Sequence, residues 1–112
     1  EGLCMAMVAV SISPIGTGET SVSHFVAEAQ RVLARYPDLQ YRLDPMFTTI
    51  EGDLPTIFAA IHEMHEALVA MGAKRLSTVI KIDDRRDVYH SMDEKVSAVM
   101  AKLNGEDASQ WE

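Results

Sequence analysis

The stretch Pro14-Ile15-Gly16-Thr17-Gly18-Glu19-Thr20-Ser21-Val22-Ser23 decides how this chain folds, because a strand ends before it and a helix begins after it. Residues 4–13 form a nearly continuous apolar run, which is typical of a strand with apolar residues on both faces. From Val22 to Tyr36 the apolar residues recur at steps of three and four, which predicts one buried face of a helix. Thr20 or Ser21 is expected to cap its first turn.

The remainder of the chain adds three strands and two helices to this pattern. Short strands at 41–43 and 47–50 flank a tight hairpin turn, and residues 76–82 form a further apolar strand. A second helix begins after the capping residue Asp53 and ends at Gly72. Ser91 and Glu94 have capping-box spacing and open a third helix. Five apolar residues of that third helix are expected to point inward: Met92, Val96, Val99, Met100 and Leu103.

The order strand, helix, strand, strand, helix, strand predicts an α+β fold of the ferredoxin-like βαββαβ type. In that sandwich both crossover helices cover one face of a four-stranded antiparallel sheet, and here an extra C-terminal helix follows. The 112 residues suit one domain over residues 1–104, with a polar C-terminal tail over 105–112.

The other face of the predicted sheet is too apolar for bulk water. Alternation along the first strand places Ala6, Val8 and Val10 toward the helices, so that Met5 and Met7 point away. By the same argument Ser77, Val79 and Lys81 lie on the outer face, together with Phe47, Thr49 and Glu51. Apolar patches of this kind mark an interface or a ligand groove, so we expect a homo-oligomer with a ligand site at its rim.

Composition excludes several classes of function. A net charge of −7 with scattered Lys and Arg argues against a nucleic-acid partner. No apolar run reaches the length of a membrane span, and the apolar residues near the N-terminus lack a basic leader, so we expect no membrane partner and a cytoplasmic location. The single cysteine, Cys4, cannot form a disulfide within the chain.

The sequence shows no catalytic machinery and no metal site. His62 and His65 are three residues apart, which is not the spacing of a helical zinc pair, so His65 is expected to be a hydrogen-bonded residue at the core edge and His62 to be solvated. Cys4 lies in mid-strand, where burial makes a thiol unreactive. We therefore expect a protein that is not an enzyme. The charged run at residues 81–87 is either a solvated turn with ion pairs or a subunit contact or ligand gate.

Several motifs in consistent order resemble the thiamine-binding protein family of small ferredoxin-like proteins, which is related to tandem-domain proteins that bind hydroxymethylpyrimidine or thiamine. The resemblance covers roughly residues 5–99. Its motifs are Pro14-Ile15-Gly16-Thr17, Ser21-Val22-Ser23, Tyr41-x-Leu43-x-Pro45-Met46, Thr48-x-Ile50-Glu51-Gly52-Asp53, His65-Glu66 and Lys81-Ile82-Asp83-Asp84-Arg85-Arg86-Asp87. Phe47 stands where the family usually has Gly, and a ring there either stacks on an aromatic ligand or fills the ligand's space.

The resemblance implies a non-catalytic binding protein for thiamine or a hydroxymethylpyrimidine precursor, with no required cofactor, in a tetramer built from sheet-packed dimers. The alternative is a structural or regulatory homo-oligomer with a vestigial groove. In the binding hypothesis Glu51 contacts the pyrimidine or the thiazolium cation and Phe47 stacks on the ligand. The other expected ligand-binding residues are Ile15, Gly16, Thr17, Ser21, Ser23 and Thr49. The expected interface residues are Met5, Met7, Val79, Lys81, Asp83, Arg85 and Arg86.

Overall fold

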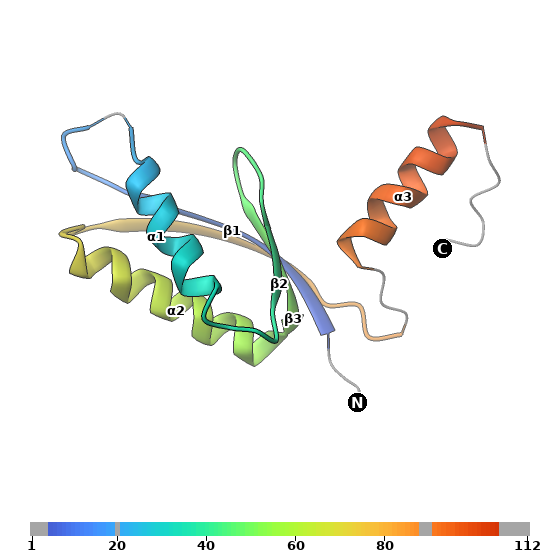
Figure 1. Ribbon diagram of the computed structural model, residues 1–112, viewed down its shortest axis with the longest axis horizontal. Coiled ribbons are helices and arrows are strands. Elements are labelled where there is room, and N and C mark those ends of the chain that lie inside the picture. Colours follow the sequence, from blue (N-terminus) through green and yellow to red (C-terminus); the bar gives the residue numbers. More distant parts are fainter. Residues whose placement is uncertain (1–4, 20, 88–90, 106–112) are drawn as a thin grey trace.

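A computed structural model describes residues 5–19, 21–87 and 91–105, and over these residues the strands and helices follow the predicted order. The elements are β1 (Met5–Pro14), α1 (Ser23–Leu33), β2 (Gln40–Leu43), β3 (Thr48–Asp53), α2 (Leu54–Ala70), β4 (Leu76–Asp83) and α3 (Met92–Leu103). In Figure 1, α1 and α2 lie together against the sheet, whereas α3 stands apart from them at the other end of the molecule. The chain is therefore a ferredoxin-like α+β sandwich with an additional C-terminal helix.

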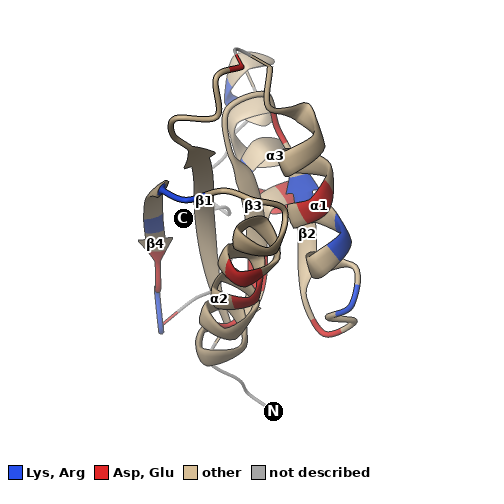
Figure 2. Ribbon diagram, turned by 90° about the vertical axis from the view of Figure 1, so that its left-hand side faces the viewer, with Lys and Arg blue, Asp and Glu red and all other residues tan. Residues whose placement is uncertain are grey.

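The strands are antiparallel and run in the order β2-β3-β1-β4, so that β2 and β4 are the edges of the sheet (Figure 2). Val8 of β1 lies opposite Ile50 of β3 and Ile82 of β4. These three residues therefore share the face covered by the helices, and their sequence neighbours share the outer face, as alternation predicts.

The core lies between the sheet and the two crossover helices. Val8 and Ile50 are fully buried, and α1 and α2 contribute Val32 and Ile57, which are also fully buried. Helix α2 begins and ends as predicted: the Asp53 side chain accepts a hydrogen bond from the backbone N–H of Thr56, and Gly72 follows the last turn with a φ of 108°. The predicted capping box between Ser91 and Glu94 is also present at the start of α3.

The start of α1 differs from the prediction. Ser21 does not cap the helix; Val22 occupies the capping position and makes no side-chain hydrogen bond to the first turn. Thr20, the other predicted cap, lies outside the described residues. Val22 instead packs against the small apolar cluster of Phe25, Leu68 and Ala73. Apolar contact, rather than a capping hydrogen bond, thus fixes where α1 begins.

The prediction that the apolar residues of α3 point inward is wrong for the single chain. Within α3, all of which is described, only Ala101 is buried, whereas Val99 and Leu103 are 57% and 74% exposed.

Two apolar residues of strand β4 are also more exposed than their inward-facing positions predict. Ile80 and Ile82 face the helix side of the sheet as expected, yet they remain 38% and 42% exposed because β4 lies at the edge and α2 packs over β1 and β3.

Candidate functional site

A groove opens beside the β2–β3 hairpin because the hairpin tip separates from the central strand. Pairing between β1 and β3 ends at Val10 and Thr48, while β1 continues to Pro14 along β4. The tip, residues 44–47, is closed by a hydrogen bond from the Asp44 N–H to the Phe47 carbonyl. Since the tip leaves β1 while α1 lies above it, a recess remains between hairpin and helix.

This recess, the hairpin groove, has a narrow inner part and a wider, more open outer part. The inner part measures about 80 Å³ and lies between β1, α1, α2 and the hairpin tip, with Ile12, Phe25, Phe47 and Met64 among its walls. The outer part measures about 530 Å³ and lies between α1 and residues 43–45. Both parts share Val26 and Gln30 of α1 with Leu43, Asp44 and Pro45 of the hairpin, so they form one continuous site.

Gln30 places an amide group in this mainly apolar groove. Its Nε2 donates a hydrogen bond of 3.0 Å to Oγ1 of Thr48, which is 6% exposed. Within the described residues Thr48 is the hydrogen-bond partner of this amide, so the side-chain oxygen of Gln30, Oε1, can accept a hydrogen bond from a ligand. A few placed polar groups on apolar walls are typical of small-molecule sites.

Asp44, the acidic residue of the groove, directs its carboxylate away from it. Oδ2 of Asp44 accepts a 3.5 Å hydrogen bond from Oγ1 of Thr49, and Oδ1 lies 3.7 Å from Nε of Arg42. Thr49 and Arg42 face each other on the outer face of the sheet. Asp44 therefore connects the hairpin tip to the outer face, and Gln30 is the residue whose amide lies in the groove.

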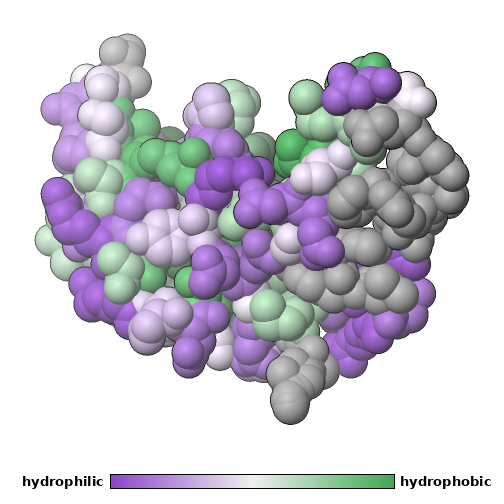
Figure 3. Space-filling model, turned by 45° about the vertical axis from the view of Figure 1, so that its right-hand side comes forward, coloured by the Kyte–Doolittle hydropathy of each residue, from purple (hydrophilic) through white to green (hydrophobic). Residues whose placement is uncertain are grey.

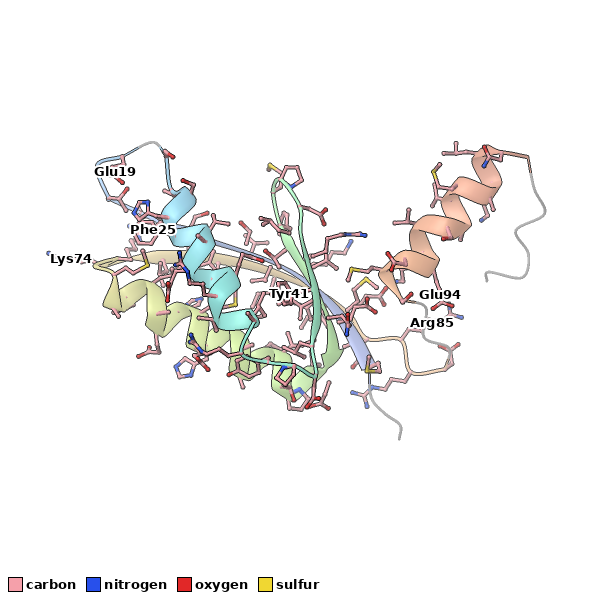
Figure 4. The ribbon with its side chains drawn as sticks, viewed as in Figure 1. Glu19, Phe25, Tyr41, Lys74, Arg85 and Glu94 are labelled. Carbon is pink, nitrogen blue, oxygen red and sulfur yellow. The ribbon has the colours of Figure 1, made fainter. Side chains whose placement is uncertain are left out.

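A second recess, the end hollow, lies where the β1–α1 loop meets the turn between α2 and β4. It measures about 320 Å³ and is lined by Ile15, Gly16 and Thr17 on one side and by residues 71–74 on the other. A hydrogen bond of 2.9 Å from the Ile15 N–H to the Arg75 carbonyl joins the two segments. Figure 4 shows Glu19 and Lys74, which both line this hollow, at the same end of the molecule.

The structure places the predicted ligand-binding residues in three separate regions. Ile15, Gly16 and Thr17 line the end hollow, Ser23 and Phe47 line the hairpin groove, Thr49 and Glu51 belong to the outer face, and Ser21 is exposed and lines neither recess. Phe25 contributes to the walls of both recesses. Glu51 lies between Met7 and Gln40 on the outer face, and it is only 6% exposed.

Five of the predicted interface residues lie on the outer face: Met5, Met7, Val79, Lys81 and Asp83. Arg85 and Arg86 follow β4 and form ion pairs with Asp87 and Asp84 at 2.8 and 2.9 Å. The hydrogen bond from Lys95 of α3 holds the pKa of Asp83 below its usual value. Similarly, the hydrogen bond to Asp87 raises the pKa of Arg85.

The two histidines of α2, His62 and His65, lie beside Glu66 and Thr78 respectively. Nε2 of His65 lies 2.7 Å from Oγ1 of Thr78, so the predicted hydrogen bond at the core edge is confirmed, and His62 is 78% exposed beside Glu66. Among the described residues, no three His, Cys, Asp or Glu side chains gather closely enough to hold a metal ion. In the same part of the chain, none of the helices has the length and apolar character needed to cross a bilayer.

Sequence reasoning named Ser23 and Phe47 of this groove but missed Val26 and Gln30, because these two α1 residues lie in and beside the apolar stripe that predicts the core. Val26 belongs to the apolar stripe of α1, and Gln30 is the polar residue one turn further along the same side of the helix. A polar residue beside an apolar stripe was the available signal. From the sequence, Asp44 and Pro45 are interpreted as hairpin turn residues, and Pro45 also as part of a family motif, but neither is predicted to line a site.

Fold and groove together define a small ferredoxin-like α+β protein with a recess beside its β2–β3 hairpin. The family model described as "Thiamine-binding protein" matches residues 8–100. The chain belongs to this family, the thiamine-binding proteins.

The chain is also similar to several relatives and solved structures. The chain is 44% identical over 102 residues to the UPF0045 protein YqgV of Bacillus subtilis, covering 88% of this chain and 98% of the relative. It is 45% identical over 103 residues to a UPF0045 protein of Staphylococcus xylosus, covering 89% and 96%. The crystal structure of a hypothetical protein from Methanocaldococcus jannaschii superposes with a TM-score of 0.78 at 35% identity, covering 88% of this chain and 98% of that one. A candidate thiamine biosynthesis or salvage protein of Thermotoga maritima shares the fold, with a TM-score of 0.71 at 22% identity over 85% of this chain and 98% of that one.

Proposed function

We propose that this protein is a cytoplasmic, non-catalytic binding protein for thiamine or its hydroxymethylpyrimidine part, and that the hairpin groove holds the pyrimidine ring. Membership of the thiamine-binding family supports the class of ligand. The position of the Gln30 amide supports the choice of this site. The amide lies among apolar residues of the groove, and its orientation is fixed by the hydrogen bond that Nε2 donates to Thr48.

The chemistry of an aminopyrimidine suits this groove. Its exocyclic amine is a hydrogen-bond donor and its ring nitrogens are acceptors, and an amide side chain offers both complementary functions. The flat ring can lie between Val26 of α1 and Pro45 of the hairpin, which face the groove from opposite sides. The thiazolium ring carries a positive charge, which the net charge of −7 favours.

Calorimetric titration with thiamine and with hydroxymethylpyrimidine tests the site. Replacing Gln30 with Ala should weaken binding by about tenfold or more, the effect of losing one buried hydrogen bond to the ligand. Gln40→Ala is the matched control, because Gln40 is an exposed glutamine on β2 whose outer-face position is away from the groove. Equal affinity in wild type and Gln30→Ala would remove the groove amide from the site.

The same titration separates the groove from the site on the outer face that the sequence suggested. Glu51→Gln removes the negative charge of Glu51 and nearly preserves the size of the side chain. If the pyrimidine or thiazolium contacts Glu51, this variant loses affinity and Gln30→Ala does not. Our proposal expects the opposite pattern, in which Glu51→Gln binds like the wild type.

A structural or regulatory oligomer without a ligand is the competing function, and one observation favours it. The narrow inner part of the groove is only about 80 Å³, and Phe47 forms one of its walls. If the Phe47 ring fills the ligand's space, thiamine and hydroxymethylpyrimidine leave the melting temperature of the wild type unchanged, whereas Phe47→Gly gains a ligand-dependent increase. A clear increase with the wild type supports the binding function.

A further inference from the structure

The Gln30 side chain needs a second residue to hold its amide in the hairpin groove. Glutamine is among the residues that lose most conformational entropy when their side chain is fixed. Gln30 is half-buried on α1 and lines both the inner and the outer part of the groove. In Figure 3, hydrophobic residues line the hollow to the left of the hairpin tip, which stands at the top centre. Apolar walls offer an amide no hydrogen bond, so a Gln30 side chain without a partner would turn toward water.

Thr48 provides the hydrogen bond that keeps the amide in place. Its Oγ1 accepts the 3.0 Å bond from Nε2 of Gln30. Thr48 begins β3 and is held between two strands, because it pairs with Val10 of β1 and with Leu43 of β2. Its side chain is buried, and as a β-branched side chain it has little freedom about χ1. The sheet therefore supplies a fixed hydroxyl to which a flexible side chain of the helix is attached.

The bond to Thr48 leaves Gln30 with the polar functions that an aminopyrimidine requires. An amide nitrogen carries two hydrogens, so after donating one to Thr48 the Gln30 side chain retains one donor and the acceptor Oε1. An aminopyrimidine has an amine donor beside a ring-nitrogen acceptor, and glutamine binds a similar pair of groups on adenine through two hydrogen bonds. An amide that is already held in the groove can form such bonds without first being ordered, which increases affinity.

We propose that Thr48 is a positioning residue for ligand binding, which acts by holding the Gln30 amide in the groove before the ligand arrives. This role rests on the proposed function of the protein. Two other roles of the hydroxyl predict different results. If Thr48 contacts the ligand directly, loss of its hydroxyl weakens binding whether or not Gln30 is present. If the bond only joins α1 to the sheet, its loss lowers stability and leaves affinity unchanged.

A double-mutant cycle, measured by calorimetric titration with thiamine, separates these roles. Thr48→Val removes the hydroxyl and nearly keeps the shape of the side chain, and it should weaken binding about three- to tenfold, the effect of one hydrogen bond. Thr48→Ser keeps the hydroxyl and should bind like the wild type. In a Gln30→Ala background, Thr48→Val should have no further effect, because the amide that Thr48 positions is absent. Equal affinity of wild type and Thr48→Val, or the same loss in both backgrounds, would overturn the proposal.

The side-chain amide of Gln30 gives a second readout, which needs no ligand. In the free protein, NMR relaxation of the side-chain amide nitrogens should show that Gln30 is more ordered than the exposed Gln40, the matched control. This order should persist in Thr48→Ser and fall to the level of Gln40 in Thr48→Val. A wild-type Gln30 amide as mobile as that of Gln40 would overturn the positioning role even where thiamine binds. A wild type that binds neither thiamine nor hydroxymethylpyrimidine would instead refute the proposed function, and this role with it.

Discussion

Gly52→Ala is the substitution whose cost the structure defines most directly. A Cβ atom at position 52 would lie 2.5 Å from Cδ2 of Leu39, 3.6 Å from the Asp38 carbonyl oxygen and 3.8 Å from Cα of Leu39. Carbon atoms in contact are normally about 3.5–4.0 Å apart, so the first of these distances is too short by about 1 Å. The φ of Gly52, 157°, is also unfavourable for a residue with a side chain.

Leu39 cannot relieve this clash without loss, because it is 4% exposed and belongs to the main core cluster. We therefore expect Gly52→Ala to lower the free energy of unfolding by about 1–3 kcal/mol, the usual cost of overfilling a packed core. Urea unfolding at one fixed protein concentration measures this value, since association changes apparent stability.

A double-mutant cycle identifies the cause. Leu39→Ala alone should cost about 2–5 kcal/mol, because it leaves a cavity in the core. Once the Leu39 side chain is removed, the new methyl group has space, so the double variant should be more stable than the sum of the two single effects predicts, by about 1 kcal/mol or more. Strict additivity, or a Gly52→Ala protein as stable as the wild type, would refute the steric explanation.

Two further predictions concern α2. Asp53→Ala removes the carboxylate that accepts a hydrogen bond from the Thr56 N–H at the start of the helix. It should lower the free energy of unfolding by about 0.5–2 kcal/mol in the same urea assay. An unchanged free energy of unfolding would exclude this cap as a source of stability. Glu63 accepts hydrogen bonds of 2.6 Å from the Tyr36 hydroxyl and 2.6 Å from Nη2 of Arg35, and these bonds lower its pKa below the usual value. Because the folded-state pKa is the lower one, the stabilisation is complete above the unfolded-state value of about 4.3 and is lost as the pH falls through the folded-state pKa. Glu63→Gln should thus be less stable than the wild type at pH 7, with a difference that shrinks below about pH 4; a difference independent of pH would contradict this origin.

The fold could be predicted because its signals are local. The continuous apolar run predicts β1, the apolar stripe predicts α1, and the capping residue Asp53 predicts the start of α2. Each of these signals is contained in a short segment of sequence. Antiparallel pairing then fixes which residues share a face, so the prediction that Val8 and Val10 face the helices is confirmed. The start of α1 was less predictable, because Val22 packs against a cluster that includes Leu68 and Ala73, and no local pattern reveals such distant residues.

The site could not be predicted in the same way, because it depends on where the strands part. Thr17 and Thr49 belong to similar hydroxyl-rich segments, yet one lines the end hollow and the other lies on the outer face. The hairpin groove arises because the β1–β3 ladder stops at Thr48, and strand length is set by the whole sheet. For α3, the apolar pattern identified one side of the helix, but periodicity alone contains no information on whether another element of the domain covers that side.

Because the hairpin tip leaves β1, substitutions in the groove wall are separated from substitutions in the central strand pair. Residues 44–47 form no ladder with the central strand, so substitutions there alter the wall of the groove without removing a residue from the pairing of β1 with β3. Diverging descendants of one ancestor can therefore acquire different ligand preferences without passing through poorly folded intermediates. For the protein engineer, these four positions form a compact library for selecting new binders on an unchanged scaffold.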